Sequence, residues 1–163
     1  MAALSALRTA GPWLCVAVIV LLLRVLYGGW AECRRGHTEL EADRPFQAAI
    51  HYERAIRWYL PGNPYVGRAA DALWDLGTTA EQQGDDELAL FAFRGLRSGA
   101  YATRSFYQPL GHRIAEADDR IAGLMIRDPR AAWPDPGLSE EQRRATVLAN
   151  HRQQTDPSTF WVI

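Results

Sequence analysis

The sequence contains no lysine, and its first 31 residues contain neither aspartate nor glutamate. All 18 basic residues are therefore arginine, and all 19 acidic residues lie at Glu32 or beyond. Within the acid-free segment lies a dense apolar run, Trp13–Leu23. This composition predicts an N-terminal segment suited to a lipid bilayer and a remainder suited to water. The absence of lysine together with abundant alanine indicates a bacterial genome rich in G and C.

Recognisable catalytic, phosphate-binding and metal-binding motifs are also missing. The sequence has no Gly-rich phosphate loop, no His-Glu-x-x-His pair and no nucleophile elbow. His112 and Glu116 have the four-residue spacing of two metal ligands on a helix, but no cysteine or second histidine joins them. We therefore expect no catalytic residue, no metal, no cofactor and no small-molecule substrate, and the chain is predicted not to be an enzyme.

Charge and cysteine usage limit the partners further. Beyond Ala31, 19 acidic residues outnumber the arginines, so nucleic acid is not an expected partner. Of the two cysteines, Cys15 lies near the start of the apolar run and Cys33 lies beyond its end, and this placement excludes an internal disulfide framework.

Residues 12–31, after a tail over 1–11, have the length of a transmembrane helix. Twenty residues at 1.5 Å each span about 30 Å, the thickness of the hydrocarbon core. Trp13 at one end and Tyr27 and Trp30 at the other have the positions of an aromatic belt that anchors the helix. Arg24 either contacts an acidic group on a partner membrane helix or extends its guanidinium to the headgroups.

A cleaved export signal is the alternative for this segment. Arg8 supplies a charged start, Trp13–Leu23 an apolar core, and Gly29–Ala31 places small residues at a cleavage site. Arg24 lies in what should then be an uncharged stretch, which favours an uncleaved anchor. The predicted location is the bacterial inner membrane as a single-pass protein. A periplasmic domain is favoured over a cytoplasmic one because a short N-terminal tail precedes an export-like run.

The rest of the chain predicts an all-α fold. Apolar residues recur at helical spacing over 48–59, 66–83, 87–98 and 105–127, with Gly99 as the expected end of the third helix. Alternating β-branched runs are absent. A Pro-rich linker follows over 128–138, and Ser139 with Gln142 resembles a capping box that opens a polar helix in the last segment, 139–163.

Residues 73–96 resemble a tetratricopeptide (TPR) repeat. Leu73, Leu76, Gly77 and Ala80 have the spacing of the first helix of that family, Gly84 lies in the turn, and Ala89, Phe93 and Leu96 have the spacing of the second. An earlier partial copy has Gly36, Ala48, Tyr52 and Ala55, with the continued membrane helix as its first helix. The copies are 41 residues apart instead of the usual 34, because 59–67 is an insertion. The resemblance implies a short, irregular solenoid of helical hairpins over 36–127.

The resemblance implies a scaffold or adaptor that binds protein partners, as a subunit of a bacterial membrane complex. The partner-binding groove would be formed by the first helix of the central repeat, through Asp71, Trp74, Asp75, Thr78 and Gln82. Its acids and tryptophan would suit a peptide with an apolar anchor and a basic residue. The alternatives are an accessory subunit that acts mainly through Arg24 in the membrane, or an exported soluble binding protein.

Three further features lie outside the groove. Arg113, Arg120 and Arg127 lie on one helix face and predict a salt-bridged surface. The aromatic segments 59–65 and 101–109 both follow second helices, so we expect them at the same edge of the domain. The chain ends on four apolar residues, which predicts a contact of the tail with a membrane or partner: Phe160, Trp161, Val162 and Ile163.

Overall fold

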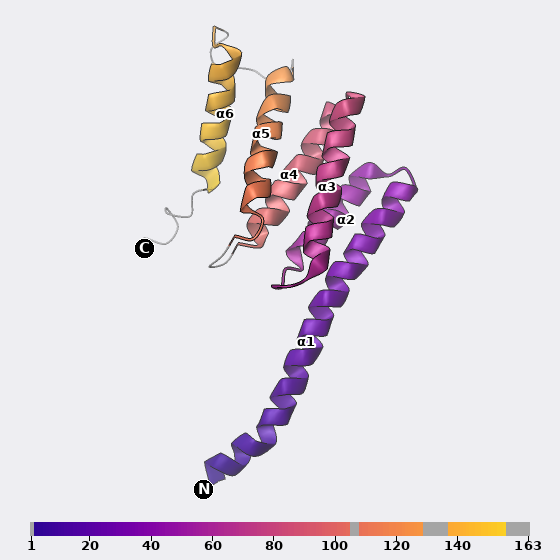
Figure 1. The fold of residues 1–163 in the computed structure, drawn as a ribbon, viewed down its shortest axis with the longest axis vertical. Coiled ribbons are helices and arrows are strands. Elements are labelled where there is room, and N and C mark those ends of the chain that lie inside the picture. The colour runs from indigo at the N-terminus through magenta and orange to yellow at the C-terminus, as the bar shows by residue number, and fades with distance from the viewer. Residues whose placement is uncertain (1, 105–107, 129–136, 156–163) are drawn as a thin grey trace.

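The computed structural model describes residues 2–104, 108–128 and 137–155, with side chains described over 11–104, 108–128 and 137–150. Over this part of the chain the fold is all-helical, with no strand, as the sequence predicts. Six helices follow one another: α1 (Ala2–Glu41), α2 (Pro45–Arg57), α3 (Pro64–Gln83), α4 (Asp86–Ala102), α5 (Gly111–Arg127) and α6 (Glu140–Thr155) (Figure 1).

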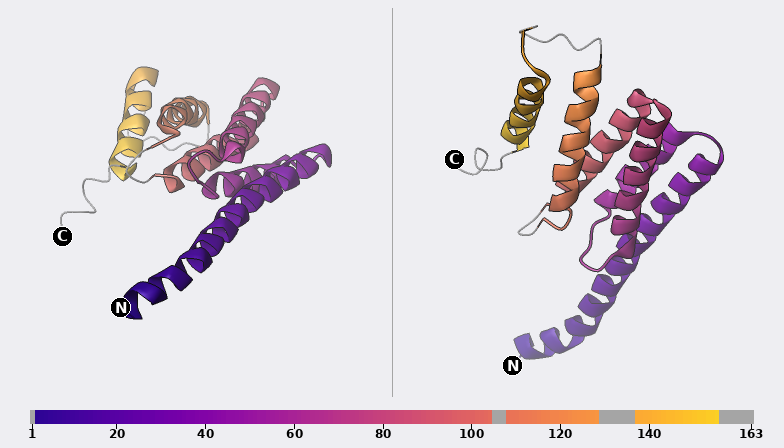
Figure 2. Two further views of the ribbon diagram at one scale, coloured as in Figure 1. Left: turned by 60° about the horizontal axis from the view of Figure 1, so that its bottom comes forward. Right: turned by 45° about the horizontal axis from the view of Figure 1, so that its top comes forward.

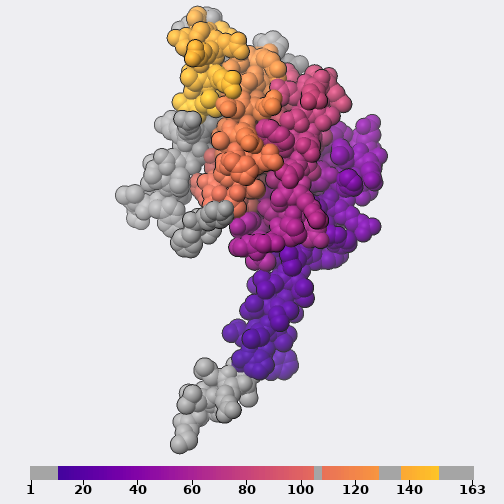
Figure 3. Space-filling view, in the orientation of Figure 1, coloured from indigo at the N-terminus to yellow at the C-terminus, as the bar shows by residue number. Residues whose placement is uncertain are grey.

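Helix α1 is one continuous helix with Pro12 inside it, and its two halves have different surroundings. Its N-terminal half projects from the domain as a stalk (Figures 1 and 3), and its side chains from Trp13 to Leu23 are exposed. Its C-terminal half packs against α2 and α3. Within the described residues, α1 is the one helix long and apolar enough to cross a membrane, a criterion that N-terminal signal sequences also meet.

Three glycines bring α1 into close contact with the domain. A Cβ atom at Gly36 would lie 2.7 Å from Tyr52 Cε1, and one at Gly28 would lie 2.6 Å from the ring of Trp58. Gly29 lies against Asn63, where an added Cβ would be 3.0 Å from Nδ2. Because any side chain at Gly28 or Gly36 would overlap an aromatic ring, these glycines determine how closely α1 approaches α2 and the α2–α3 loop.

The two N-terminal hairpins, α1/α2 and α3/α4, repeat the same geometry at an offset of 41 residues. A Cβ at Gly77 would lie 2.8 Å from Phe93, just as Gly36 meets Tyr52. Asp43 (φ 56°) and Gly84 (φ 77°) are both left-handed and occupy equivalent positions in the two turns. The turns share their hydrogen bonds, with Arg44 N donating to Glu39 O and Asp85 N donating to Ala80 O. The chain therefore contains two copies of one helical hairpin.

Successive helices stack in chain order, and α2 also packs on α4 (Figures 1 and 2). The core lies between the hairpins, where Ile56, Leu73, Phe93, Leu96, Ile121 and Leu124 are the largest fully buried side chains. Helix α5 closes this core, and α6 adds an outer layer on α5.

Two predicted helix boundaries were wrong for physical reasons. Gly99 does not end α4, which continues to Ala102, because Gly99 is a packing position where an added Cβ would lie 3.1 Å from Ile56. Helix α5 begins at Gly111 and not near 105, after a turn at Pro109 and Leu110, since a proline disfavours helix at the residue before it. The N-terminal tail predicted over 1–11 is helical from Ala2.

Side-chain caps begin two helices, and the one at Ser139 confirms the predicted capping box. Asp85 Oδ1 accepts a hydrogen bond from Leu88 N at 3.0 Å at the start of α4. Ser139 Oγ accepts from Gln142 N, and Gln142 Oε1 accepts from Ser139 N, which is the reciprocal capping box at the start of α6. Most of the Pro-rich linker lies outside the described residues.

Candidate functional site

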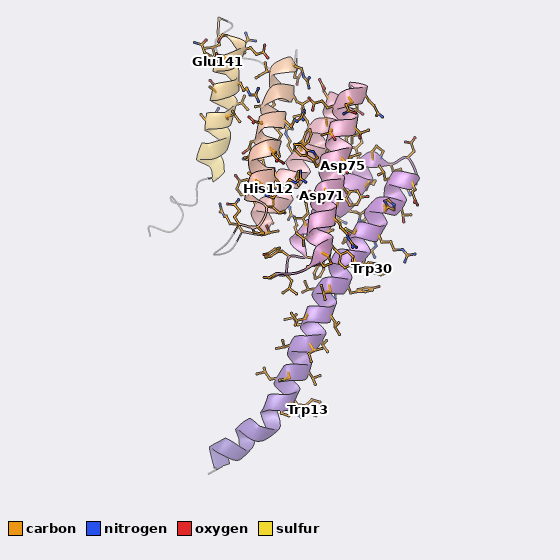
Figure 4. All side chains as sticks on the ribbon, in the orientation of Figure 1. Trp13, Trp30, Asp71, Asp75, His112 and Glu141 are labelled. Carbon is orange, nitrogen blue, oxygen red and sulfur yellow. The ribbon has the colours of Figure 1, made fainter. Side chains whose placement is uncertain are left out.

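An open pocket of about 440 Å³ lies where α1, α2 and α3 meet. Side chains from α1 form one wall, side chains from α3 form the other, and Tyr52 of α2 contributes between them. Its lining is Trp30, Cys33, Arg34, His37, Tyr52, Tyr65, Arg68 and Ala72. Trp30 lies at the end of the pocket nearest the stalk (Figure 4).

The pocket combines aromatic rings with two arginines. The guanidinium of Arg34 lies 5.4 Å from the ring centroid of Trp30, and that of Arg68 lies 5.4 Å from the ring centroid of Tyr65. No carboxylate lines the pocket, and among the described side chains neither arginine forms an ion pair. At the rim, His37 Nε2 lies 3.9 Å from Glu41 Oε1. The pocket therefore presents fixed positive charge on an apolar lining.

The lining also contains two weakly acidic groups, the Cys33 thiol and the Tyr52 hydroxyl. Burial raises the pKa of the Cys33 thiol, and the positive charge of Arg68 opposes that rise. Burial also raises the pKa of the Tyr52 hydroxyl. The Cys33 thiol donates to the carbonyl oxygen of Tyr65 at 3.5 Å, which joins α1 to α3. Because both groups stay protonated at neutral pH, they do not neutralise the arginines, and the thiol lacks the thiolate character of a catalytic nucleophile.

The pocket occupies the position in the first hairpin that sequence analysis predicts as a groove in the second. Subtracting the 41-residue offset moves Asp71, Trp74, Asp75, Thr78 and Gln82 onto Trp30, Cys33, Arg34, His37 and Glu41. Four of these five α1 residues line the pocket, and the fifth, Glu41, lies 3.9 Å from one of them, His37. The sequence predicts Trp30 only as a membrane anchor and predicts no site at the other lining residues, although this offset is a signal that indicates them.

The predicted groove on α3 is largely occupied by the chain itself. Arg113 Nη2 of α5 lies 2.6 Å from Asp71 Oδ1. Its guanidinium and that of Arg120 lie 5.4 and 5.6 Å from the Trp74 ring centroid, and Phe93 contacts that ring edge-on at 5.4 Å. Trp74 is consequently half-buried.

The remaining groove residues have few contacts. The hydroxyl of Thr78 donates to the backbone carbonyl of Trp74 at 3.0 Å. Asp75 and Gln82 are exposed, and Figure 4 shows Asp71 and Asp75 on the same stretch of α3. Binding of a partner along this face stays a prediction.

The seven-residue arginine series acts between helices. Besides the contact of Arg113 with Asp71, Arg120 lies 3.1 Å from Glu81, and Arg127 lies 2.8 Å from the other oxygen of Glu81. The spacing predicts a salt-bridged face, and the described ion pairs show that it extends from α5 to α3. This row of contacts holds α5 over α3.

Arg24 and the belt residues lie on the stalk and at its junction with the domain. The Arg24 guanidinium lies 4.7 Å from the ring centroid of Trp58, so it contacts an aromatic ring of its own chain. Trp13 and Tyr27 are largely exposed, and the Tyr27 and Trp30 ring centroids are 5.5 Å apart. A contact of Arg24 with a partner helix stays a prediction. The predicted apolar tail, 160–163, lies outside the described residues.

Within the described residues, no group of three or more histidine, cysteine or acidic side chains is placed to hold a metal ion. Comparisons of the chain with protein-family models, with curated proteins and with solved structures found no match.

Proposed function

We propose that this chain is a non-catalytic, membrane-anchored scaffold or adaptor of a bacterial membrane complex, built from TPR-like hairpins. The pocket between α1 and α3 carries the proposal. It offers two arginines that have no carboxylate partner among the described side chains, each stacked on an aromatic ring, at the equivalent of the predicted groove position. Stacking orients a guanidinium before a ligand arrives, so less conformational entropy is lost when it binds.

The chemistry of the pocket selects an acidic segment of a protein partner. Arg34 and Arg68 suit a carboxylate, with which arginine forms short, charge-assisted hydrogen bonds. Trp30, Tyr52 and Tyr65 offer apolar surface to a neighbouring side chain. This changes the expected charge of the partner: the acids of α3 favour a basic peptide, but Asp71 is already paired with an arginine of α5.

The position of the pocket selects a partner close to the bilayer. Helix α1 continues without a break from the apolar run into the pocket, and Arg34 lies three residues beyond the end of the predicted span at Ala31. At 1.5 Å per residue this is about 5 Å along the axis, or about 17 Å when it is counted from Leu23, where the exposed apolar run ends. The partner segment would therefore be an acidic stretch of a juxtamembrane protein or of a membrane-bound subunit.

Site-specific photo-crosslinking in native membranes tests the proposal. A photoreactive residue at His37, whose side chain is 73% exposed at the rim, should form a covalent adduct with another protein. Arg34→Ala with Arg68→Ala should abolish the adduct, and Arg54→Ala, an exposed arginine on α2 outside the pocket, should leave it intact. An adduct yield that is unchanged in the double arginine variant, or an adduct with lipid alone, would contradict a protein-binding pocket.

The proposed periplasmic side of the domain has its own test. Gln83 is exposed at the end of α3, so Gln83→Cys with Cys15→Ser and Cys33→Ser gives one accessible thiol. A membrane-impermeant maleimide should label this thiol in intact spheroplasts. Labelling only after lysis would place the domain in the cytoplasm.

A further inference from the structure

The loop between α2 and α3 packs against α1 at the end of the domain from which the stalk projects (Figure 1). Trp58, at the end of α2, covers Gly28, and the guanidinium of Arg24 lies over its ring. Asn63 follows in the loop and lies against Gly29. These contacts fix the height of the loop along α1, between Arg24 and Gly29.

The position of that height relative to the bilayer depends on where the membrane segment ends. A span over 12–31 places Arg24 and Gly28 inside the hydrocarbon, since 20 residues cover about 30 Å. A span shifted towards the N-terminus, over 4–23, places them about 2–8 Å outside it. The headgroup layer is about 5–7 Å thick on each side of the membrane. Trp58, which contacts both residues, therefore lies about 5–11 Å inside the hydrocarbon edge with the first span and in or next to the headgroup layer with the second. Since α1 packs against the domain from Arg24 onwards, the second span is the one that leaves this end of the domain outside the hydrocarbon.

The loop has the composition of an interfacial element. Trp58 and Tyr59 are amphipathic aromatics, the type of side chain that is enriched at the membrane–water boundary. Leu60 is half-buried, Pro61 is exposed, and no charged residue lies between Trp58 and Pro64. Tyr27 of α1, largely exposed, lies at the same height.

The loop also satisfies part of its own backbone. Asn63 Nδ2 donates to the carbonyl of Trp58 at 2.9 Å, and Asn63 Oδ1 accepts from Tyr65 N at 3.1 Å. Asn63 N donates to the carbonyl of Leu60 at 2.9 Å. Asn63 is 7% exposed, so these bonds are internal. Internal pairing of this kind lowers the cost of placing a loop where water is scarce.

We propose that residues 58–62 form a membrane-docking foot that enters the interfacial layer of the bilayer crossed by α1. The occupant of this surface is lipid, and the foot with α1 gives the domain two attachment points and so a fixed tilt. The pocket is then held at the membrane surface. The proposal rests on the part of the proposed function that makes α1 a membrane anchor, and it does not depend on the pocket.

Spin-label accessibility in vesicles tests the foot on the full chain. Nitroxides are attached singly at Pro61→Cys, at Gln83→Cys and at native Cys15, with the other cysteines changed to serine, in phosphatidylcholine–phosphatidylglycerol vesicles. Gln83 is the matched control because it is exposed at the opposite end of α3, about 30 Å away along a 20-residue helix. Collisions with oxygen, which concentrates in lipid, are compared with collisions with a water-soluble nickel chelate.

The foot predicts that the oxygen-to-nickel collision ratio at position 61 is several-fold higher than at position 83 and approaches that at Cys15. A ratio at 61 equal to that at 83, with Cys15 in lipid, overturns the foot and leaves the anchor intact. Protection of position 61 from both reagents also overturns it, because protein and not lipid then covers the loop. A water-exposed Cys15 overturns the anchor and the foot together.

Discussion

The substitution Gly77→Ala tests the close contact between the helices of the repeated hairpin. A Cβ at this position would lie 2.8 Å from Cε1 and Cζ of Phe93, which is at least about 0.7 Å short of a favourable carbon–carbon contact. Phe93 is fully buried and contacts Trp74, so a shift of its ring disturbs neighbouring side chains. Forcing one extra methyl into a packed core costs about 1–3 kcal/mol.

The control for this prediction is Gly123→Ala on α5, where nothing lies within 4 Å of an added Cβ. Alanine favours a helix over glycine by up to about 1 kcal/mol, and this gain is common to both variants. The difference in unfolding free energy between them therefore isolates the steric cost. We expect Gly77→Ala to be the less stable by about 1–3 kcal/mol, or roughly 4 °C in Tm for each kcal/mol.

Thermal and denaturant unfolding of the full chain in detergent micelles, followed by circular dichroism, would measure both variants. Gly36→Ala should behave like Gly77→Ala, because its Cβ would lie 2.7 Å from Tyr52 at the equivalent position of the first hairpin. Equal stability of Gly77→Ala and Gly123→Ala would refute the close-packed hairpin.

Three further outcomes are expected from single contacts. Trp74→Ala should destabilise the domain by about 2–3 kcal/mol, since half-buried packing is lost, whereas Arg113→Ala should cost under about 1 kcal/mol because its ion pair is partly solvated; equal losses in denaturant unfolding would contradict this. Alkylation of Cys33 needs the thiolate, and burial raises the pKa of the thiol, so the rate should rise only at pH above the ordinary thiol range. Arg68→Met should move that pH profile further upwards; a downward shift would be inconsistent with the charge effect. Asn63→Ala leaves two backbone groups without their partner and should cost about 1–3 kcal/mol in the same unfolding assay, and an unchanged Tm would contradict the role given to this side chain.

Local sequence signals predicted most of the helices because their causes are local. The end of α3 at Gln83 follows from Gly84, whose positive φ is easily adopted by glycine, and the start of α4 follows from the cap at Asp85. Gly99 shows the limit of this reasoning. Glycine ends a helix or lets two helices approach, and only the position of Ile56 decides between the two.

The candidate site was less predictable because it depends on which helix covers which face. Spacing placed Trp74 and Asp71 on one side of α3, but it did not show that arginines of α5 reach that side. The same periodicity applied to α1 would have indicated Trp30, Arg34 and His37. Those positions were instead interpreted through the membrane segment that precedes them.

The most direct test of the central claim is a random-peptide selection against the full chain held in lipid nanodiscs. The account predicts that selected peptides are enriched in aspartate or glutamate next to an apolar residue. It also predicts that their binding weakens at least about tenfold in Arg34→Ala with Arg68→Ala, since a hydrogen bond to a charged group contributes about 1.5–3 kcal/mol. Arg54→Ala should bind them as the unchanged chain does. Selection of peptides without an acidic excess, or equal binding by the pocket variant, would contradict the account.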